Sequence, residues 1–365
     1  MSNQNDFYKE NAINANRAKK VIRDFEKDSD GNIIIKDGTY VSSKLNTNQY
    51  NFTNGWILLS QPGTINREGV QGTMALVKSY IPDKYPGYYD ESDIEILRAN
   101  NFIMSEIAKQ FELEAAEYYN VVFEDSDELK NRENYIIEGR TKKQKIKPNT
   151  RYLLTPSFRK NNEKMIHLAE FLKKPDELDA RKLLNEIRTY LLSENVVASD
   201  IDNVLRDFIK QSIFNKFIDF SDEHNLNAGI LLTNDKKEKR ARLAPCYDLD
   251  FSGGVYNITD GGYTKYFFRH NEKGGISLTS ILATFFTQFE RNYLAEIIPK
   301  IDIEEAIKTG EQNGNCKLSE IVRVKYENFF RAQQEELESF YNNYCKNYNN
   351  NRTSESKNRD NGEPR

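Results

Sequence analysis

The pattern of apolar and polar positions divides the chain into a strand-rich first part and a helix-rich second part. Short apolar runs bounded by turn residues predict strands at 31–38, 55–60, 74–80, 116–123, 134–138 and 151–156. Beyond residue 161 the apolar residues recur at helical spacing, at 165–171, 179–192, 198–220, 278–298 and 318–344. The first part contains one predicted helix, at 92–113, and a basic loop at 142–149. The pattern predicts an α+β fold.

A polar loop and a predicted hairpin bring polar side chains together in the second part. The run from Thr233 to Arg242 lies between two apolar segments and is typical of a hairpin tip. Asp222-Glu223-His224-Asn225-Leu226-Asn227 precedes the first strand, and Asp248 follows the second. The two strands of a hairpin run antiparallel, so the two ends away from the turn lie side by side. We therefore expect these polar groups to converge.

Phosphoryl transfer requires this set of residue types. One carboxylate orients the attacking hydroxyl and accepts its proton, while an amide oxygen and a second carboxylate hold Mg²⁺ on the nucleotide phosphates. We therefore expect Asp222 to be the base and Asn227 and Asp248 to bind the metal, with His224 supporting the loop. Asp250 is the alternative metal ligand if the register differs by two residues.

An apolar segment in the first part ends in a lysine. The run Ala75-Leu76-Val77-Lys78 predicts a strand whose lysine points at the α- and β-phosphates of ATP. Small residues near such a strand let backbone N–H groups approach phosphate oxygens. Two segments fit that role, 60–64 and 69–73, and the sequence does not choose between them. Gly72, in the second, is the candidate nucleotide contact.

The predicted helix at 92–113 offers an acidic partner for this lysine. In the protein-kinase arrangement a glutamate of the corresponding helix pairs with the strand lysine. Glu106 is the first candidate because it lies in the middle of the helix, and Glu95 is the alternative.

The Asp-x-His-x-x-Asn loop, the short hairpin and the Pro-x-Tyr-Asp at 245–248 resemble the catalytic core of HipA-like serine/threonine kinases. The loop is also similar to that of phosphatidylinositol 3- and 4-kinases. The resemblance implies a two-lobed protein-kinase-like fold, with an N-terminal antiparallel sheet lobe and a mainly helical C-terminal lobe. The expected divisions are a polar segment at 1–30, the lobes at 31–157 and 158–345, and a disordered tail at 346–365.

The same resemblance implies transfer of the ATP γ-phosphate to a serine or threonine hydroxyl of a protein, with Mg²⁺ and with autophosphorylation. Ser60, Thr64 and Thr73 are the hydroxyls near the expected nucleotide loop. A lipid kinase, a small-molecule kinase and a non-catalytic nucleotide-binding pseudokinase remain as alternatives. The glycine loop does not match clearly and residues 1–50 are short for a further subdomain, so toxin–antitoxin partners are not carried over.

Composition narrows the classes of partner. A net charge of −4 gives no general basic footprint, so a nucleic-acid partner is not favoured. The short basic run at 236–242 is typical of a solvated loop. Three cysteines without CxxC spacing and three scattered histidines indicate neither a disulfide framework nor a histidine-built metal site. The first residues show no basic-then-apolar signal pattern, and no window approaches 18 apolar residues. We therefore expect a cytoplasmic location and no membrane span, and secretion by a route without a cleaved signal stays open.

Overall fold

The structure is a computed structural model of the 365-residue chain. It describes residues 22, 25–36, 40–42, 55–59, 65–66, 69–70, 73–79, 91–127, 135–138, 142–160, 162–172, 180–220, 227–233, 238–250, 252 and 288–346. The predicted tail, apart from residue 346, lies outside these ranges.

A six-stranded sheet forms most of the first lobe. Its order is β1-β7-β10-β6-β3-β2, and every neighbouring pair is antiparallel except β1 with β7. The strands are β1 (Ile33–Ile35), β2 (Tyr40–Ser42), β3 (Gly55–Leu59), β6 (Thr73–Ser79), β7 (Tyr119–Phe123) and β10 (Arg151–Pro156). Alternate residues of three strands are buried in one apolar cluster, as a one-sided core requires: Ala75, Val77, Val121, Phe123, Tyr152 and Leu154. The predicted antiparallel sheet is confirmed.

Two short hairpins accompany this sheet. β4 (Ile65–Asn66) pairs with β5 (Gly69–Val70), and β8 (Tyr135–Glu138) pairs with β9 (Lys142–Lys145). The prediction of a loop at 142–149 is therefore wrong for its first half. Lys142 lies opposite Glu138 in the backbone ladder.

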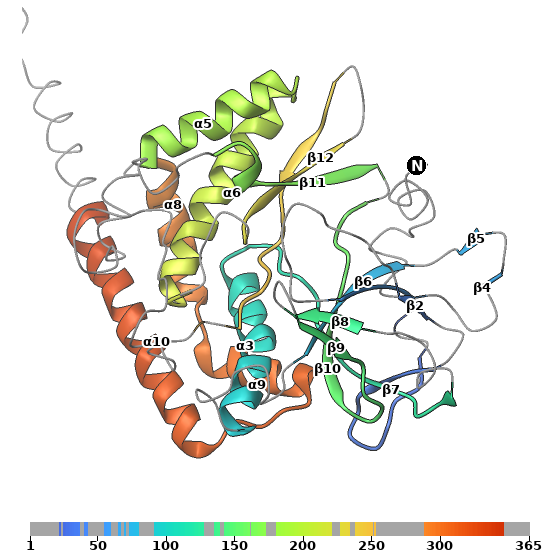
Figure 1. Ribbon diagram of the computed structural model, residues 1–365. Coiled ribbons are helices and arrows are strands. Elements are labelled where there is room, and N and C mark those ends of the chain that lie inside the picture. The colour runs from blue at the N-terminus through green and yellow to red at the C-terminus, as the bar shows by residue number, and fades with distance from the viewer. Residues whose placement is uncertain are drawn as a thin grey trace, which may run out of the picture.

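The second lobe combines helices with a three-stranded sheet. Figure 1 shows the helices gathered on the left and the large sheet on the right. The helices are α5 (Ala180–Ser193), α6 (Ala198–Phe217), α8 (Gln288–Ile297), α9 (Ile303–Gly314) and α10 (Glu320–Phe340), with short 3-10 turns η2 (Leu168–Glu170) and η4 (Ile298–Lys300) and a π turn η5 (Tyr341–Lys346). The sheet is β11 (Glu163–His167), β12 (Gly229–Thr233) and β13 (Ala241–Leu243), in that order.

Two features of this lobe differ from the sequence prediction. The segment 165–171 was expected to be helical, but residues 163–167 form β11 and pair with the whole of β12. Backbone pairing with a distant strand has overridden a short and ambiguous apolar pattern. The helix α9 was not predicted. The hairpin β12–β13 is confirmed, with Ile230 opposite Leu243.

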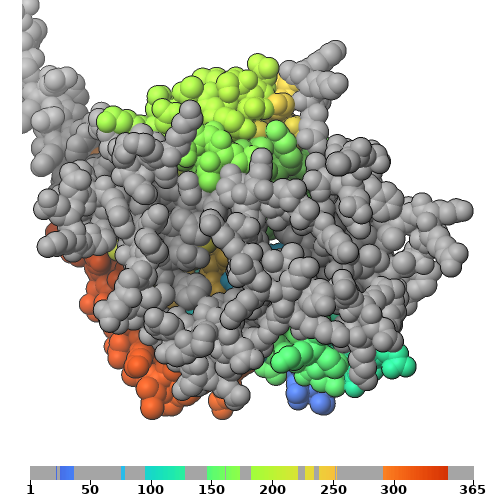
Figure 2. Space-filling model, in the orientation of Figure 1, coloured from blue at the N-terminus to red at the C-terminus, as the bar shows by residue number. Residues whose placement is uncertain are grey.

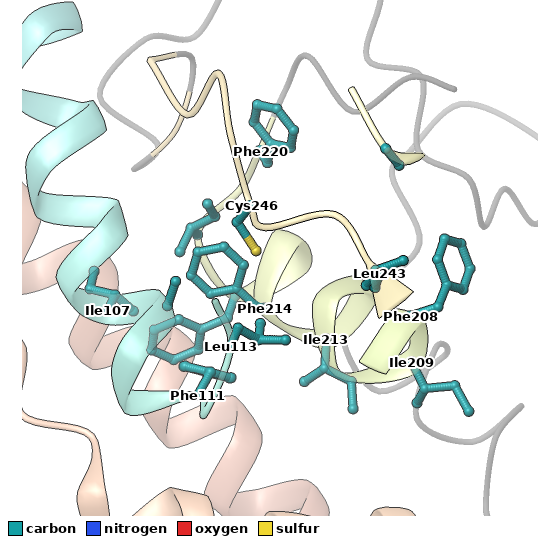
Figure 3. Packing of buried hydrophobic residues seen from close by; sticks show 14 of the residues in the cluster. Ile107, Phe111, Leu113, Phe208, Ile209, Ile213, Phe214, Phe220, Leu243 and Cys246 are labelled. Atoms are coloured by element: carbon teal, nitrogen blue, oxygen red, sulfur yellow. The ribbon is translucent and has the colours of Figure 1, made fainter. Parts of the chain in front are cut away.

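The helix α3 (Glu91–Gln110) packs with the second lobe, although it lies within the expected first lobe at 31–157. The ring of Phe111, just after α3, lies 5.6 Å from that of Phe214 and 5.0 Å from that of Phe217, both on α6. Figure 3 shows Phe111 and Ile107 among the buried residues of this cluster, with Cys246 beside Phe214. The position of α3 is therefore set by the helical core.

A glycine permits close contact between α3 and α9. A Cβ at Gly310 would lie 2.7 Å from the Cα of Ile103 on α3, a separation that only glycine avoids. On the face drawn in Figure 2, α5 lies at the top, α10 at the lower left and residues of the blue N-terminal stretch at the lower right, so this view spans both lobes. Within the described ranges, none of the helices is both long and apolar enough to span a bilayer.

Candidate active site

Lys78 of β6 joins two carboxylates that follow the hairpin of the other lobe. Its Nζ contacts Oδ1 of Asp248 and lies 2.6 Å from Oδ2 of Asp250. The side chain of Asp250 is completely buried, that of Lys78 is 11% exposed and that of Asp248 is 30% exposed. The lysine cation thus pairs with two carboxylates of a segment about 170 residues further along the chain. Of the three side chains, that of Asp248 is the most exposed to solvent.

The hairpin brings Asn227 to the same end as these carboxylates. The backbone N–H of Ala244 donates to the Gly229 carbonyl at 2.9 Å, which extends the ladder beyond β12 and β13. Asn227 lies two residues before Gly229, and Asp248 lies four residues after Ala244. Asn227 is buried, at 6% exposure. Its role as an amide ligand of a metal beside Asp248 stays a prediction from the sequence.

The stretch from Cys246 to Asp248 is held by the segment that connects α3 to β7. The N–H of Cys246 donates to the Glu114 carbonyl at 2.8 Å, and the Cys246 carbonyl accepts from Ala116 N–H at 2.8 Å. The N–H of Asp248 donates to the phenol oxygen of Tyr118 at 3.0 Å. Asp248 has φ of 60°, a left-handed conformation that aspartate tolerates better than most residues. These bonds fix the backbone on which the Asp248 carboxylate is mounted.

Burial keeps the phenols near this stretch protonated. It raises the pKa of Tyr118 far above its usual value, and the nearby Asp248 carboxylate raises it further. Burial raises the pKa of Tyr247 in the same way. The thiol of Cys246 has its pKa raised to about 12 by burial, so it is a neutral core group in the cluster of Figure 3. Nucleophilic chemistry at this end of the hairpin is therefore not expected from these three groups.

Two adjacent asparagines of α3 hold the residues around Asp250. The amide nitrogen of Asn100 donates to the carbonyls of Asp250 and Ser252, at 2.5 and 3.0 Å. The amide oxygen of Asn101 accepts from the N–H of Leu249 at 3.2 Å. The sequence prediction missed both asparagines and Tyr118. The available signal was an Asn-Asn pair inside the apolar pattern of the helix at 92–113.

Glu106 and Glu95 have partners other than Lys78. The Oε1 of Glu106 lies 2.6 Å from Nζ of Lys109 and accepts from the amide of Asn313 on α9 at 2.9 Å. Glu95 forms ion pairs with two arginines. The expected pairing of a helix glutamate with Lys78 is thus not made by either candidate. The physical reason is that α3 is docked on α9, while two aspartates already balance the charge of Lys78.

The basic run at 236–242 anchors the hairpin instead of forming a solvated loop throughout. Arg240 donates to both oxygens of Asp200, from Nε at 2.6 Å and from Nη2 at 2.9 Å, and these bonds lower the pKa of Asp200. Arg242 binds both oxygens of Glu163 on β11 and donates to the Phe158 carbonyl at 2.9 Å. The hairpin is therefore tied to α6 and to the connection between the lobes.

Three of the predicted site residues lie outside the described ranges. These are Asp222, His224 and Gly72. The candidate acceptors Ser60 and Thr64 also lie outside them. Their roles stay predictions from the sequence.

Comparisons with known proteins identify the fold. Neither the family models nor the curated proteins contain a match to the chain. Among solved structures, it is similar to the crystal structure of the proinflammatory kinase CtkA from Helicobacter pylori, with a TM-score of 0.52 and 12% identity over 85% of this chain and 99% of that one. The HipA protein of Shewanella oneidensis MR-1, solved with HipB and operator DNA, gives a TM-score of 0.42 and 13% identity over 79% of this chain and 65% of that one, which is too low to support an argument.

The first similarity is strong enough to show a shared fold and no more. It covers nearly the whole of the other chain and includes both lobes of this one. The protein described here therefore has the two-lobed α+β fold of a kinase structure.

Proposed function

We propose that the protein is a cytoplasmic, ATP- and Mg²⁺-dependent kinase that transfers the γ-phosphate to a serine or threonine hydroxyl of a protein. The observation that carries this proposal is the ion pair of Lys78 with Asp248 and Asp250. It joins a strand of one lobe to the end of a hairpin in the other, where a two-lobed kinase places its nucleotide. The similarity to a kinase structure supports the same conclusion.

The donor set at this point suits a magnesium ion. Mg²⁺ prefers hard oxygen ligands and binds through one or two carboxylates together with substrate phosphates. Asp248 and Asp250 supply carboxylates that converge on one point, and Asn227 supplies an amide at the same end of the hairpin. When bound, the ion would contribute charge neutralisation on the phosphate oxygens.

Each residue has a distinct task in the proposed reaction. Lys78 supplies a positive charge for the α- and β-phosphates. Asp248 and Asn227 hold the metal side of the nucleotide, and Asp222 orients the acceptor hydroxyl and accepts its proton. Most of the catalysis then comes from positioning and electrostatics, as phosphoryl transfer requires.

Transfer of labelled phosphate tests this function directly. The purified chain is incubated with γ-labelled ATP and Mg²⁺, alone, with candidate proteins and with phosphatidylinositol vesicles. We expect label on protein, and mass spectrometry should find self-phosphorylation at Ser60, Thr64 or Thr73. The matched control is Asp222→Asn, which should bind ATP normally and transfer no phosphate.

The other outcomes separate the alternatives. Label on lipid alone would identify a lipid kinase. ATP binding without label on any acceptor would identify a nucleotide-binding module without turnover. Equal labelling by the wild type and by Asp222→Asn would refute the role of this aspartate as the base.

A further inference from the structure

The backbone around Asp250 is held from one side by neutral amides. Asn100 is completely buried, and its single NH₂ group donates to the carbonyls on both sides of residue 251, those of Asp250 and Ser252. The next residue, Asn101, is 1% exposed, accepts from Leu249 N–H and donates to the carbonyl of Leu97 within α3. Two neighbouring side chains therefore fix three backbone groups in the stretch from 249 to 252.

This hydrogen-bonded arrangement controls where the Asp250 carboxylate points. A buried side chain on a fixed backbone has few alternative rotamers, and the Oδ2 of Asp250 lies 2.6 Å from Nζ of Lys78. The held Leu249 N–H and Asp250 carbonyl lie on either side of the Asp250 Cα along the chain, so together they restrict the position of that Cα and the direction in which its side chain leaves the backbone. The support is itself rigid, because α3 is packed against α9 at Gly310 and against α6 at Phe111.

The chemical nature of the support matters for the charge balance. An asparagine adds no charge, so it does not compete with the two aspartates for Lys78. In the proposed reaction it also does not compete with the phosphates. An aspartate at position 100 would point a carboxylate oxygen at two carbonyl oxygens in a buried site. Residues that orient a metal ligand through a hydrogen bond are known to change metal affinity when they are replaced.

We propose that Asn100 is a positioning residue that sets the orientation of Asp250 and thereby the affinity of the site for a divalent cation. The inference rests on the proposed function, and it adds Asp250, the second carboxylate of that donor set, to the metal ligands Asp248 and Asn227. In this proposal α3 contributes to the site through the hydrogen bonds of Asn100 to the backbone around Asp250. It does not contribute through a glutamate paired with Lys78.

The test compares the wild type with Asn100→Asp and Asn100→Ala. The measurements are the Mg²⁺ concentration that half-saturates binding of a fluorescent ATP analogue, the affinity for that analogue without metal, and hydrogen exchange of the peptide that contains residues 245–252. We expect the Mg²⁺ requirement of both variants to rise about 10- to 100-fold, the metal-free affinity to change less than about 2-fold, and the peptide to exchange faster. Asn100→Ala protects the test against failure of Asn100→Asp to fold.

A second buried asparagine provides the matched control. Asn120 on β7 is 7% exposed and donates to the carbonyl of Gly314, and neither residue contacts Lys78 or its two aspartates through any hydrogen bond that the described ranges contain. Asn120→Ala should lose stability and keep the wild-type Mg²⁺ requirement.

The following results would decide whether Asn100 positions Asp250. An unchanged Mg²⁺ requirement in the folded Asn100 variants overturns the proposal, and so does an equal increase in Asn120→Ala. If the wild type binds no ATP analogue, the proposed function fails, and hydrogen exchange then decides the positioning role alone. In that case faster exchange at 245–252 in the Asn100 variants supports the role, and unchanged exchange overturns it.

Discussion

Replacing Lys78 with methionine should destabilise the protein even without nucleotide or metal. The substitution keeps most of the apolar stem and removes the cation that balances Asp248 and Asp250. Removing one partner of a buried ion pair costs about 3–5 kcal/mol, and the completely buried Asp250 belongs to this class. Asp248 is 30% exposed, so its lost pair adds about 0–1 kcal/mol. We therefore expect a loss of about 4 kcal/mol, which is about a thousandfold in the unfolding equilibrium.

Urea denaturation followed by circular dichroism measures this loss, in a buffer free of nucleotide and Mg²⁺. The double variant Lys78→Met with Asp250→Asn should regain at least half of the lost free energy, because the buried carboxylate that loses its ion pair with Lys78 has been replaced by a neutral amide. Lys109→Met is the matched control, since Lys109 is 59% exposed and pairs at the surface, and it should cost at most about 1 kcal/mol. A Lys78→Met protein as stable as the wild type would refute the assignment of Lys78 as the counter-ion of Asp250.

Three further predictions concern residues outside this ion pair. Glu106→Gln should leave the affinity for ATP within about 2-fold of the wild type by titration, because this carboxylate binds Lys109 and not the site lysine; a loss beyond 10-fold would contradict that placement. Asp200→Asn should lower the urea midpoint at pH 7. The contribution of Asp200 is complete above its unfolded-state pKa of about 3.9 and is lost as pH falls through its lower folded-state pKa, so the variant and the wild type should converge only at pH values below that folded-state pKa. Gly310→Ala should destabilise by about 1–3 kcal/mol in thermal unfolding, because its Cβ would meet backbone atoms of Ile103; an unchanged melting temperature would refute this contact.

The features that the sequence predicts well are determined locally. The hairpin at 229–243 has two apolar strands and a polar tip, and this pattern needs no distant partner to define it. Because the hairpin is local, its two ends meet, and Asn227 and Asp248 are brought to one end by chain connectivity alone. The strand that ends near Lys78 was predictable for the same reason.

The features that the sequence does not predict depend on partners far along the chain. The segment at 163–167 becomes a strand because β12, more than sixty residues later, supplies its hydrogen bonds. In α9 the glycines at 310 and 314 resemble helix breakers, yet Gly310 is required by the approach of α3. The sequence also does not show that Asn100, and not Glu106, contacts the segment containing Asp250. That depends on how α3 is rotated about its axis, and the helical spacing of apolar residues alone does not determine this rotation.

The left-handed backbone at Asp248 has an evolutionary consequence. At φ of 60° most side chains are strained, whereas asparagine and aspartate are both accommodated. A codon for aspartate becomes one for asparagine by a single base change. The charge that the proposed function assigns to metal binding is therefore separated from a neutral side chain by one mutation that the backbone conformation does not oppose.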